Sequence, residues 1–275
     1  LHSFPTRRSS DLPGCIRSEG QRIIIEYLRD IGSADIELLR ALPGTSYANI
    51  SALNEKGIIK IIESESIRNP YAEYARIRNT APIELSPAQQ TAYATIESEL
   101  MSDSARAVLL FGVTGSGKTK VIMKAIDKTL SEGKGVIMLV PEIALTPQTV
   151  GIFCTRYGER VAVIHSALSQ GERFDAWRRI KRGEVDLVIG TRSAIFAPLE
   201  NIGMIVIDEE HEHTYKSESD PKYHARDIAA FRCGQNNALM LLASATPSLE
   251  SFYKAQTGTY TLAPLRERYG GVRLP

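Results

Sequence analysis

Residues 107 to 130 read AVLLFGVTGSGKTKVIMKAIDKTL, and this stretch decides the fold. Its opening apolar run is typical of a buried strand, and the run from residue 120 to 130 is typical of a helix. Between them, residues 112 to 119 match the pattern GxxxxGK[ST]. Glycines let the backbone wrap around phosphates, and the amino end of the helix adds oriented N–H groups. The stretch predicts a nucleoside triphosphate site; a chance glycine-rich turn would lack the flanking strand and helix.

Two side chains of this loop have defined chemistry. Lys118 would reach the β- and γ-phosphates, and Thr119 would hold Mg²⁺. The positions expected to contact ATP are Gly112, Gly115, Ser116, Gly117, Lys118 and Thr119. Upstream, LSPAQQ places Gln89 or Gln90 before the first strand. An amide at that place could read adenine, or it could simply lie on the surface.

A series of apolar, β-rich runs alternates with helical stretches after residue 105: AVLLFG, GVIMLVP, VAVIH, VDLVIG, IGMIVID and ALMLLASAT. Near-continuous apolar strands separated by helices predict an α/β fold with a parallel sheet covered on both faces. In such sheets, ligands bind at the carboxyl ends of the strands. Most polar motifs of the sequence begin at one of these ends.

The acids Asp208, Glu209 and Glu210, with His211, follow the apolar run IGMIVI, so they should lie at the end of a buried strand. Asp208 is then the second Mg²⁺ ligand. Glu209 is placed to orient or activate an attacking water. A solvated strand end could carry the same acids, but their pairing with the phosphate loop on one sheet favours phosphoryl transfer to water.

Composition limits the classes of protein to consider. The 275 residues are 43% hydrophobic and 24% charged, as in ordinary soluble proteins. A net charge of +1 gives no global basic field, so any nucleic-acid surface must be local. The longest apolar runs, such as GVIMLV, are far too short to span a bilayer. Three scattered cysteines without CxxC spacing fit a reducing cytosol and argue against a disulfide framework or a zinc site in this sequence.

Residues 15–68 are predicted to form a small winged-helix domain. QRIIIEYLRD has helical spacing, SADIELLRAL offers Ser33 as an N-cap, and TSYANISALNEKG supplies a third helix that ends at Gly57. The β-branched run IIKIIESES then indicates a strand or wing. Winged helices often bind DNA, but residues 17 to 66 hold six basic side chains against eight acidic ones. The domain could therefore grip a duplex or dock against neighbouring domains.

The other boundaries follow from composition. Residues 1–14 are polar, begin without Met, and are expected to be a non-native or disordered leader. Residues 69–84 form a polar linker punctuated by prolines, and residues 85–265 form the α/β lobe. Residues 266–275 close no element. They are expected to begin a connection to a further part, so that the chain is an internal fragment.

Residues 208–211, DEEH, form an acid box that leads directly into a segment with aromatic and basic side chains, namely Tyr215, Lys216, Tyr223, His224 and Arg226. Bases stack on tyrosines without sequence preference, and lysine or arginine meets phosphates. Alternatively, this is a flexible loop whose tyrosines pack on the lobe. A second basic run, RFDAWRRIKRGE (173 to 184), carries Phe174, Trp177 and Ile180 at a spacing that predicts an amphipathic surface helix.

The motifs together point to a family. They are LFGVTGSGKT, VPEIALTPQ, HSALS with ERFDAW, GTRSAIFAP, DEEH with YK and YHARD, and SATPSLES. The phosphate loop, TRSA, DEEH and SAT resemble the first motor lobe of superfamily 2 helicases. The full set more closely resembles the PriA family of bacterial primosomal replication-restart helicases, over residues 17 to 275. The resemblance implies a RecA-like P-loop NTPase lobe preceded by a small winged-helix domain.

The resemblance also implies roles for residues of the nucleotide site. Gln89 matches the glutamine that reads adenine. Lys118 and Thr119 match the phosphate and Mg²⁺ ligands, and Asp208 and Glu209 match the metal and water pair.

Further roles implied by the resemblance concern DNA. His211 matches an element that links the nucleotide site to DNA, and so do Ser244, Ala245 and Thr246. Thr191 and Arg192 fall where such lobes meet the strand backbone, although Arg192 could equally be a structural salt-bridge partner. The residues that match the family's aromatic-rich loop, which senses single-stranded DNA, are Tyr215, Lys216, Tyr223, His224 and Arg226.

The predicted function is that of an ATP-dependent 3′→5′ DNA helicase of replication restart, with ATP and Mg²⁺ as cofactors and Lys118, Asp208 and Glu209 as catalytic residues. The expected partners are single-stranded and forked DNA, other primosome proteins and single-stranded DNA-binding protein, in the cytoplasm and away from membranes. The family's zinc module and second motor lobe are expected outside this chain, which alone should be poorly active. The alternatives are a non-enzymatic DNA-fork-binding module and a superfamily 2 ATPase acting on RNA or protein.

Overall fold

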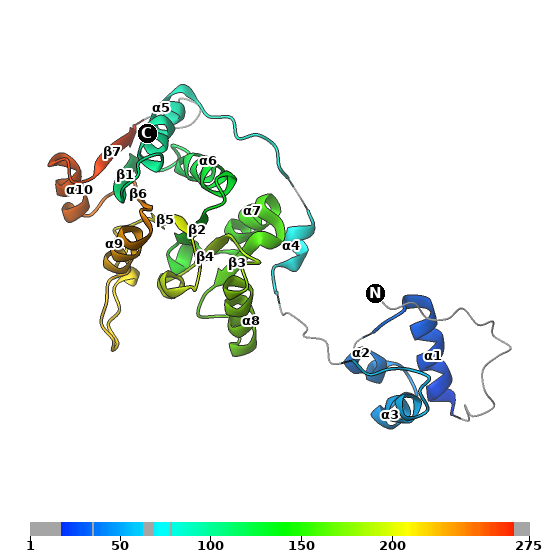
Figure 1. Cartoon of the computed structure of the whole chain (residues 1–275). Coiled ribbons are helices and arrows are strands. Elements are labelled where there is room, and N and C mark those ends of the chain that lie inside the picture. The colour runs from blue at the N-terminus through cyan, green and yellow to red at the C-terminus, as the bar shows by residue number, and fades with distance from the viewer. Residues whose placement is uncertain (1–17, 35, 63–68, 78, 267–275) are drawn as a thin grey trace. The chain divides into compact units, whose positions relative to one another are not determined.

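The computed structural model describes residues 18–34, 36–62, 69–77 and 79–266 (Figure 1). The chain divides into two compact units, Leu1–Ser66 and Ile67–Pro275. This division falls next to the predicted end of the first domain. The predicted leader (residues 1–14) and nearly all of the predicted C-terminal connection (residues 267–275) lie outside the described residues.

In the small unit the described residues form three helices, α1 (Glu19–Ile31), α2 (Ile36–Ala41) and α3 (Tyr47–Glu55). Their apolar sides enclose a small core of buried side chains, Ile24, Leu39, Ile50 and Leu53. At Gly20 the helix α1 approaches the turn before α3 so closely that a Cβ would lie 2.3 Å from the Gly44 carbonyl oxygen. Glycine is therefore required there by packing.

Two details of the small unit differ from the predicted winged helix. The helix α2 begins at Ile36, so Ser33 does not stand directly before it as an N-cap. Residues 58–62 form no strand, because the N–H groups of Ile58 and Ile59 donate to the Leu53 carbonyl and extend the end of α3. The rest of the expected wing, residues 63–66, lies outside the described residues. The winged-helix assignment remains a prediction that the helices support.

The large unit is built on a seven-stranded sheet in which every pairing is parallel. The strands are β1 (Arg106–Gly112), β2 (Gly135–Leu139), β3 (Val161–Ile164), β4 (Leu187–Gly190), β5 (Ile202–Asp208), β6 (Leu239–Ser244) and β7 (Thr261–Leu265). Their spatial order is β3-β4-β2-β5-β6-β1-β7. The predicted α/β lobe is thus confirmed. Strands β1 and β5, which lead into the phosphate loop and the acid box, are both neighbours of β6.

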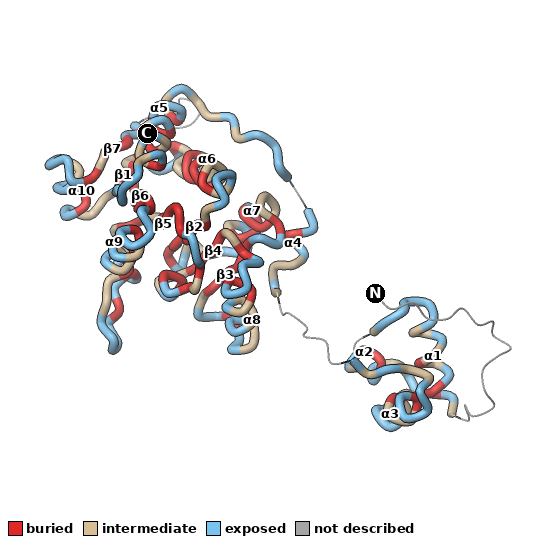
Figure 2. The backbone as a smooth tube through the Cα atoms, viewed as in Figure 1, coloured by how far each residue is buried: buried red, intermediate tan, exposed pale blue. Residues whose placement is uncertain are grey.

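Helices cover both faces of this sheet, and the strands between them are buried (Figures 1 and 2). One face carries α5 (Pro87–Leu100), α6 (Lys118–Ser131) and α7 (Pro147–Tyr157). The other carries α8 (Gln170–Lys181), α9 (Ala225–Asn236) and α10 (Leu249–Gln256). Short 3₁₀ helices lie in the connections: η1 (Glu142–Ala144), η2 (Gly158–Arg160), η3 (Arg192–Phe196) and η4 (His213–Tyr215).

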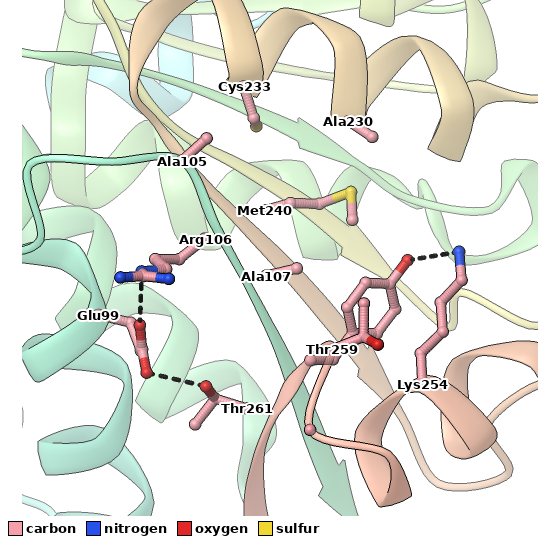
Figure 3. A pocket seen from close by; sticks show the side chains of 12 residues that line it. Glu99, Ala105, Arg106, Ala107, Ala230, Cys233, Met240, Lys254, Thr259 and Thr261 are labelled. Carbon is pink, nitrogen blue, oxygen red and sulfur yellow. Dashed lines mark hydrogen bonds and ion pairs between the residues drawn. The ribbon is translucent and has the colours of Figure 1, made fainter.

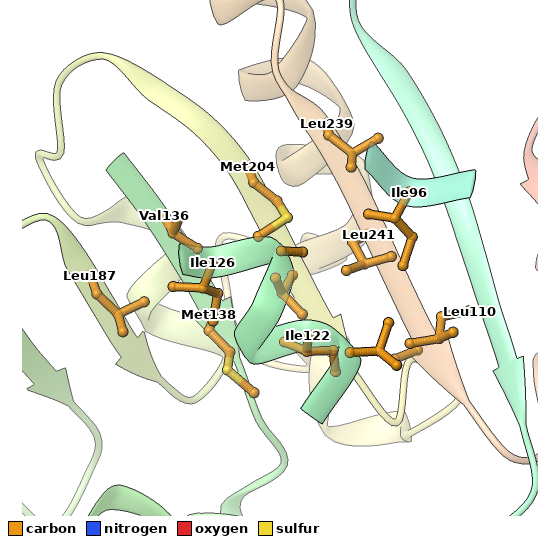
Figure 4. Packing of buried hydrophobic residues seen from close by; sticks show 14 of the residues in the cluster. Ile96, Leu110, Ile122, Ile126, Val136, Met138, Leu187, Met204, Leu239 and Leu241 are labelled. Atoms are coloured by element: carbon orange, nitrogen blue, oxygen red, sulfur yellow. The ribbon is translucent and has the colours of Figure 1, made fainter. Parts of the chain in front are cut away.

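The two-sided burial follows from the apolar runs in the sequence. Along β1, Val108 and Leu110 join the core beneath α5, α6 and α7, while Leu109 joins the opposite core. Figure 4 shows Ile122 and Ile126 of α6 among the side chains that cover the first face of the sheet. Because both faces of the sheet are apolar, the polar side chains of the strands lie at the strand ends. Among the described helices, none is long and apolar enough to cross a membrane.

Part of the predicted linker is ordered against the large unit. The short helix α4 (Ala72–Arg76) lies on α7, where the ring of Tyr74 takes the space that a side chain at Gly151 would need. Further along, the N–H of Asn79 donates to the Thr155 carbonyl at 3.0 Å, and Arg156 donates to the Ala81 carbonyl at 2.8 Å. Residues before α5 are therefore attached to the lobe at several points.

Candidate active site

The phosphate loop, residues 112–119, joins the carboxyl end of β1 to the first turn of α6. Gly115 and Gly117 have φ angles of 79° and 82°, a left-handed conformation that favours glycine. Gly112 leaves no room for a side chain, since a Cβ there would lie 2.8 Å from the Ser116 hydroxyl oxygen. The loop therefore curls as the GxxxxGK[ST] pattern requires, and Lys118 is the first residue of α6.

Two polar groups of this loop suit an anionic ligand. The Ser116 hydroxyl is buried, and no hydrogen-bond partner reaches it among the described residues. The Lys118 ammonium donates to the Gly112 carbonyl at 3.0 Å and lies 3.8 Å from a carboxylate oxygen of Glu209. A phosphate in the loop would give the hydroxyl a partner and would attract the ammonium. The residues present thus fit the predicted nucleotide.

Asp208 is the last residue of β5 and lies at the same edge of the sheet as the phosphate loop. One of its carboxylate oxygens accepts from the N–H of Glu209 at 3.1 Å. Burial, followed by the negative charge of Glu209, raises the pKa of Asp208 to about 6. A cation beside this carboxylate would favour its ionised form. The environment of Asp208 therefore suits the predicted Mg²⁺.

The described residues contain no group of three or more His, Cys, Asp or Glu side chains that could hold a metal. This does not conflict with the predicted ion. Mg²⁺ is usually bound through one or two protein oxygens together with phosphates and waters. Thr119 and Asp208 stay the predicted protein ligands.

His211 meets the SAT motif that follows β6. Its Nδ1 lies 2.9 Å from the Ser244 hydroxyl and 3.7 Å from a carboxylate oxygen of Glu209. Its Nε2 lies 3.4 Å from the hydroxyl of Thr246. The acid box and the SAT motif therefore form one hydrogen-bonded group. A movement of the SAT motif would displace His211 and, through it, the carboxylate of Glu209.

Sequence reasoning missed a buried ion pair between Glu210 and Arg226. The Glu210 side chain has no exposed surface, and it lies 3.1 Å from the Arg226 guanidinium. The same carboxylate accepts from the N–H of Ser248 at 2.6 Å and from the Ser251 hydroxyl at 2.9 Å. Arg226 donates to both serine hydroxyls as well. Arg226, expected to meet DNA phosphates, is instead engaged inside the lobe in this conformation.

Replacing Glu210 by Gln is expected to lower the free energy of unfolding of the large unit by about 1–3 kcal/mol, because the Arg226 charge loses its counter-ion in a buried place. Urea unfolding followed by circular dichroism measures the change. The matched control is Glu212→Gln, two residues further on, which should change it by less than about 0.5 kcal/mol. Equal stability of the two variants would contradict the role given to Glu210.

Gln89 is placed differently from the expectation that it reads adenine. It is fully buried, its side-chain oxygen accepts from the N–H of Ser86 at 3.0 Å, and its amide donates to the Ser116 carbonyl at 2.9 Å. The first contact completes a capping box at the start of α5. Because both ends of the amide are engaged, Gln89 attaches the phosphate loop to α5 and does not face a base in this conformation.

Arg192 organises the segment between the acid box and α9. Its guanidinium donates to the carbonyls of Thr214, at 3.2 Å, and of Lys216, and it lies 5.7 Å from the centre of the Tyr223 ring. Tyr223 also meets Phe196 edge to face, with ring centres 5.0 Å apart. Arg192 therefore contacts this segment through two backbone carbonyls and one aromatic ring.

Tyr215 is buried, with 1% of its surface exposed, and its hydroxyl donates to the Asp208 carbonyl at 2.6 Å. Its ring cannot stack on a base in this conformation. Of the two readings of this segment, packing on the lobe is the one that describes Tyr215. Lys216 is exposed and Tyr223 is partly exposed. These two side chains remain the predicted contacts for DNA.

A separate cavity of about 370 Å³ lies at the amino edge of the sheet (Figure 3). Arg106 pairs with Glu99 on one side of it, and Lys254 donates to the Tyr260 hydroxyl on another. Ala107 and Met240, from two strands, also line it. No residue predicted for the nucleotide or for DNA is among its lining residues, so this cavity is distinct from the candidate active site.

The carboxyl edge of the sheet thus brings together a phosphate loop, an acid pair and a hydrogen-bonded SAT motif. This combination, on a parallel sheet with helices on both faces, defines a nucleotide-binding motor lobe of RecA-like build.

Comparison with known proteins extends this class to a family. A family model described as DEAD/DEAH box helicase matches residues 86–255. The chain belongs to the DEAD/DEAH box helicase family. Among solved structures, RecG bound to a three-way DNA junction matches with a TM-score of 0.53 and 24% identity, over 92% of this chain and 31% of that chain. This likeness supports the fold alone.

The predicted resemblance to PriA is confirmed. The chain is 50% identical to the replication restart protein PriA of Bacillus subtilis over 231 residues, which cover 84% of this chain and 29% of that protein. It is 40% identical to the PriA of Haemophilus influenzae over 259 residues, which cover 92% of this chain and 34% of that protein. The chain therefore spans about a third of the length of these relatives.

Proposed function

We propose that this lobe belongs to an ATP-dependent 3′→5′ DNA helicase that acts in replication restart, during primosome assembly at stalled forks. The observation that carries the proposal is the 50% identity to a PriA protein over 84% of the chain. The geometry of the site supports the ATPase part, because Lys118 and Glu209 approach within 3.8 Å at the edge where β1 and β5 end. The proposed partners are single-stranded and forked DNA, other primosome proteins and single-stranded DNA-binding protein, and the proposed location is the cytoplasm.

In this function the chain's own residues bind, orient and move a proton. The phosphate loop and Lys118 would hold the phosphates, and Thr119 and Asp208 would hold Mg²⁺. Mg²⁺, when bound, neutralises charge that develops on the phosphate oxygens. Glu209 would orient the attacking water and accept its proton. The contact of Glu209 with His211 and Ser244 would tie this step to movements of the SAT motif.

DNA could act on this site through a short chain of contacts. Tyr223 and Lys216 would touch the strand, and Arg192 joins both of them through a ring contact and a carbonyl. Arg192 also holds the carbonyl of Thr214, which precedes Tyr215. Tyr215 in turn donates to the Asp208 carbonyl. A movement of the DNA-contacting segment is therefore passed to the backbone that positions Asp208 and Glu209.

Replacing Tyr215 by Phe is expected to reduce the stimulation of ATP hydrolysis by DNA in the full-length protein by about 2- to 12-fold, which corresponds to one hydrogen bond of 0.5–1.5 kcal/mol. Basal hydrolysis should change less. Tyr253→Phe, on the exposed side of α10, serves as the control. Coupling through Tyr215 is refuted if the ratio of stimulated to basal rate is the same in both variants.

The proposed function is tested by comparing how strongly DNA and RNA stimulate ATP hydrolysis. The full-length protein is assayed for ATP hydrolysis alone, with single-stranded DNA, with forked DNA and with RNA of matched sequence. We expect DNA to stimulate hydrolysis strongly and RNA to do so weakly. Preference for RNA would favour the alternative of an RNA-directed superfamily 2 ATPase. Binding of forked DNA without any hydrolysis would favour the non-enzymatic fork-binding module.

A further inference from the structure

The backbone of Glu209 has an uncommon conformation. Its φ angle is 44°, in the left-handed region that residues other than glycine rarely adopt. The other described non-glycine residues with a positive φ are Asn201 and Asn237, and asparagine tolerates this conformation better than glutamate does. Such a conformation persists where the surrounding structure holds it in place. The contacts next to Glu209 therefore have to hold its backbone.

This left-handed turn directs the Glu209 side chain into the candidate active site. Asp208 is the last residue of β5, and one residue later the Glu209 carboxylate lies 3.8 Å from the Lys118 ammonium. Its other oxygen lies 3.5 Å from the Ser244 hydroxyl. The next side chain, Glu210, contacts α9 and α10 instead. The direction of the Glu209 carboxylate thus depends on how the chain turns between Asp208 and Glu210.

Glu210 anchors this turn to three elements, β6, α9 and α10. Its N–H donates to the Ala243 carbonyl at 3.1 Å, which keeps the chain beside β6 after β5 has ended. Its side chain has no exposed surface, and the carboxylate accepts from the Ser248 N–H and hydroxyl, the Ser251 hydroxyl and the Arg226 guanidinium. An amide at this place could not accept from all of these donors, because one of its two polar groups is itself a donor.

The same carboxylate also holds the turn that carries the SAT motif. Ser248 is the N-cap of α10, and three residues separate it from Ser244 at the end of β6. The Ser244 hydroxyl lies 3.5 Å from Glu209 and 2.9 Å from His211. Glu210 therefore acts on Glu209 in two ways, through the adjoining peptide and through the turn whose hydroxyl faces the Glu209 carboxylate.

We propose that Glu210 and Arg226 are positioning residues for ATP hydrolysis, which keep the Glu209 carboxylate directed at the attacking water. The inference rests on the proposed function, in which Glu209 orients that water and accepts its proton. Arg226 supplies the counter-charge for the buried Glu210 carboxylate. Both residues act through the geometry of Glu209. This geometry matters because a misplacement of about 1 Å can cost about 10²-fold in rate.

A pair that serves stability alone is the alternative. Buried ion pairs add little net stability compared with apolar side chains of similar size, because both charges lose their hydration. A pair that only joined α9 to α10 would also leave the left-handed φ of Glu209 without a cause. The position of Glu210, directly after Glu209, therefore favours a role in hydrolysis.

The first test uses the full-length protein without DNA. Glu210→Gln should lower kcat for ATP hydrolysis by about 10- to 100-fold, because a misplaced general base loses much of its contribution of about 10²–10⁴-fold. The affinity for a fluorescent ATP analogue should change less than about twofold, and circular dichroism shows that the variant is folded. The matched control is Glu250→Gln, which removes an exposed carboxylate from the first turn of α10 and should leave kcat within about twofold.

A double-mutant cycle separates positioning from stability. In a Glu209→Gln background the positioned carboxylate is gone, so adding Glu210→Gln should lower the single-turnover rate of phosphate release by less than about twofold. A loss by the same factor in both backgrounds, or an unchanged kcat in the folded Glu210→Gln protein, would overturn the proposal. Ser251→Ala removes a single hydrogen bond to Glu210 and goes through the same cycle as a milder variant, with an expected loss of about 2- to 12-fold.

Arg226 is tested by a conservative and a neutral substitution, again without DNA, so that contacts with a strand do not contribute. Arg226→Lys keeps a positive charge beside Glu210 and should retain most of kcat. Arg226→Gln leaves the buried carboxylate without a counter-charge and should lower kcat by about 10- to 100-fold. Equal rates for the two variants would contradict the role given to Arg226.

The outcomes distinguish this inference from the proposed function. If the unaltered protein hydrolyses ATP and Glu210→Gln behaves as Glu250→Gln does, the inference is wrong and the proposed function stands. If RNA rather than DNA stimulates hydrolysis, the proposed function is wrong, and the double-mutant cycle still decides the role of Glu210. If the unaltered protein hydrolyses no ATP with or without DNA, both fail.

Discussion

Replacing Lys118 by Ala is expected to lower the rate of ATP hydrolysis by the full-length protein by about 10²–10³-fold, while the fold and the binding of DNA stay intact. A preorganised cation at a developing negative charge contributes about this much to a phosphoryl or acyl transfer. The structure adds a reason why folding should survive. Lys118 contacts Gly112 and Glu209 at the rim of the site, and it belongs to neither of the hydrophobic cores.

The same substitution in the 275-residue chain should weaken the binding of a fluorescent ATP analogue by about 10- to 150-fold, as expected for a hydrogen bond to a charged group. Lys124→Ala, on the same helix α6 but outside the phosphate loop, is the matched control and should bind as the unaltered chain does. Hydrolysis within a few-fold of the unaltered rate would refute the role assigned to Lys118.

The sequence predicted those parts of the fold that depend on local patterns. Within the stretch that matches GxxxxGK[ST], Gly117 of the pattern and the additional Gly115 adopt the left-handed conformation that favours glycine. The apolar runs predicted a parallel sheet, because strands that are buried on both faces must alternate with covering helices. The parallel pairing puts the carboxyl ends of β1 and β5 at one edge of the sheet, so Asp208 and Lys118 lie at the same edge, as the motifs had indicated.

The parts that could not be predicted depend on contacts between distant segments. Tyr215 and Tyr223 look alike in the sequence, but one is buried beneath Asp208 and the other meets Arg192 near the surface. From the sequence alone, Arg226 is predicted to bind a phosphate, but in the structure it pairs with Glu210. The capping role of Gln89 could have been predicted from the sequence, because Ser86 stands three residues before it at the spacing of a capping box.

The 275-residue chain by itself is expected to bind Mg-ATP but to hydrolyse it about 10³–10⁵-fold more slowly than the full-length protein. This is the largest effect we predict. By resemblance to superfamily 2 motors, ATP is closed between two lobes, and the second lobe supplies an arginine finger. Such a finger contributes about 10³–10⁵ in rate where it has been dissected. Two arginines of this lobe already have partners within it. Arg226 pairs with Glu210, and Arg192 donates to the carbonyls of Thr214 and Lys216.

To measure this, residues 13–275 and the full-length protein are purified side by side, and both are assayed for nucleotide binding and for phosphate release with and without single-stranded DNA. If the short chain binds Mg-ATP with an affinity within about tenfold of that of the full-length protein, this shows that the lobe is folded. Lys118→Ala in the short chain should weaken that binding by about 10- to 150-fold, the loss of one hydrogen bond to a charged group, which shows that the signal comes from this chain and not from a contaminating ATPase. Rapid, DNA-stimulated turnover by the short chain would mean that a complete catalytic site is present in these residues. A cation for the transition state would then have to come from within this lobe, and release of Arg192 from its carbonyls by DNA would be the first arrangement to examine.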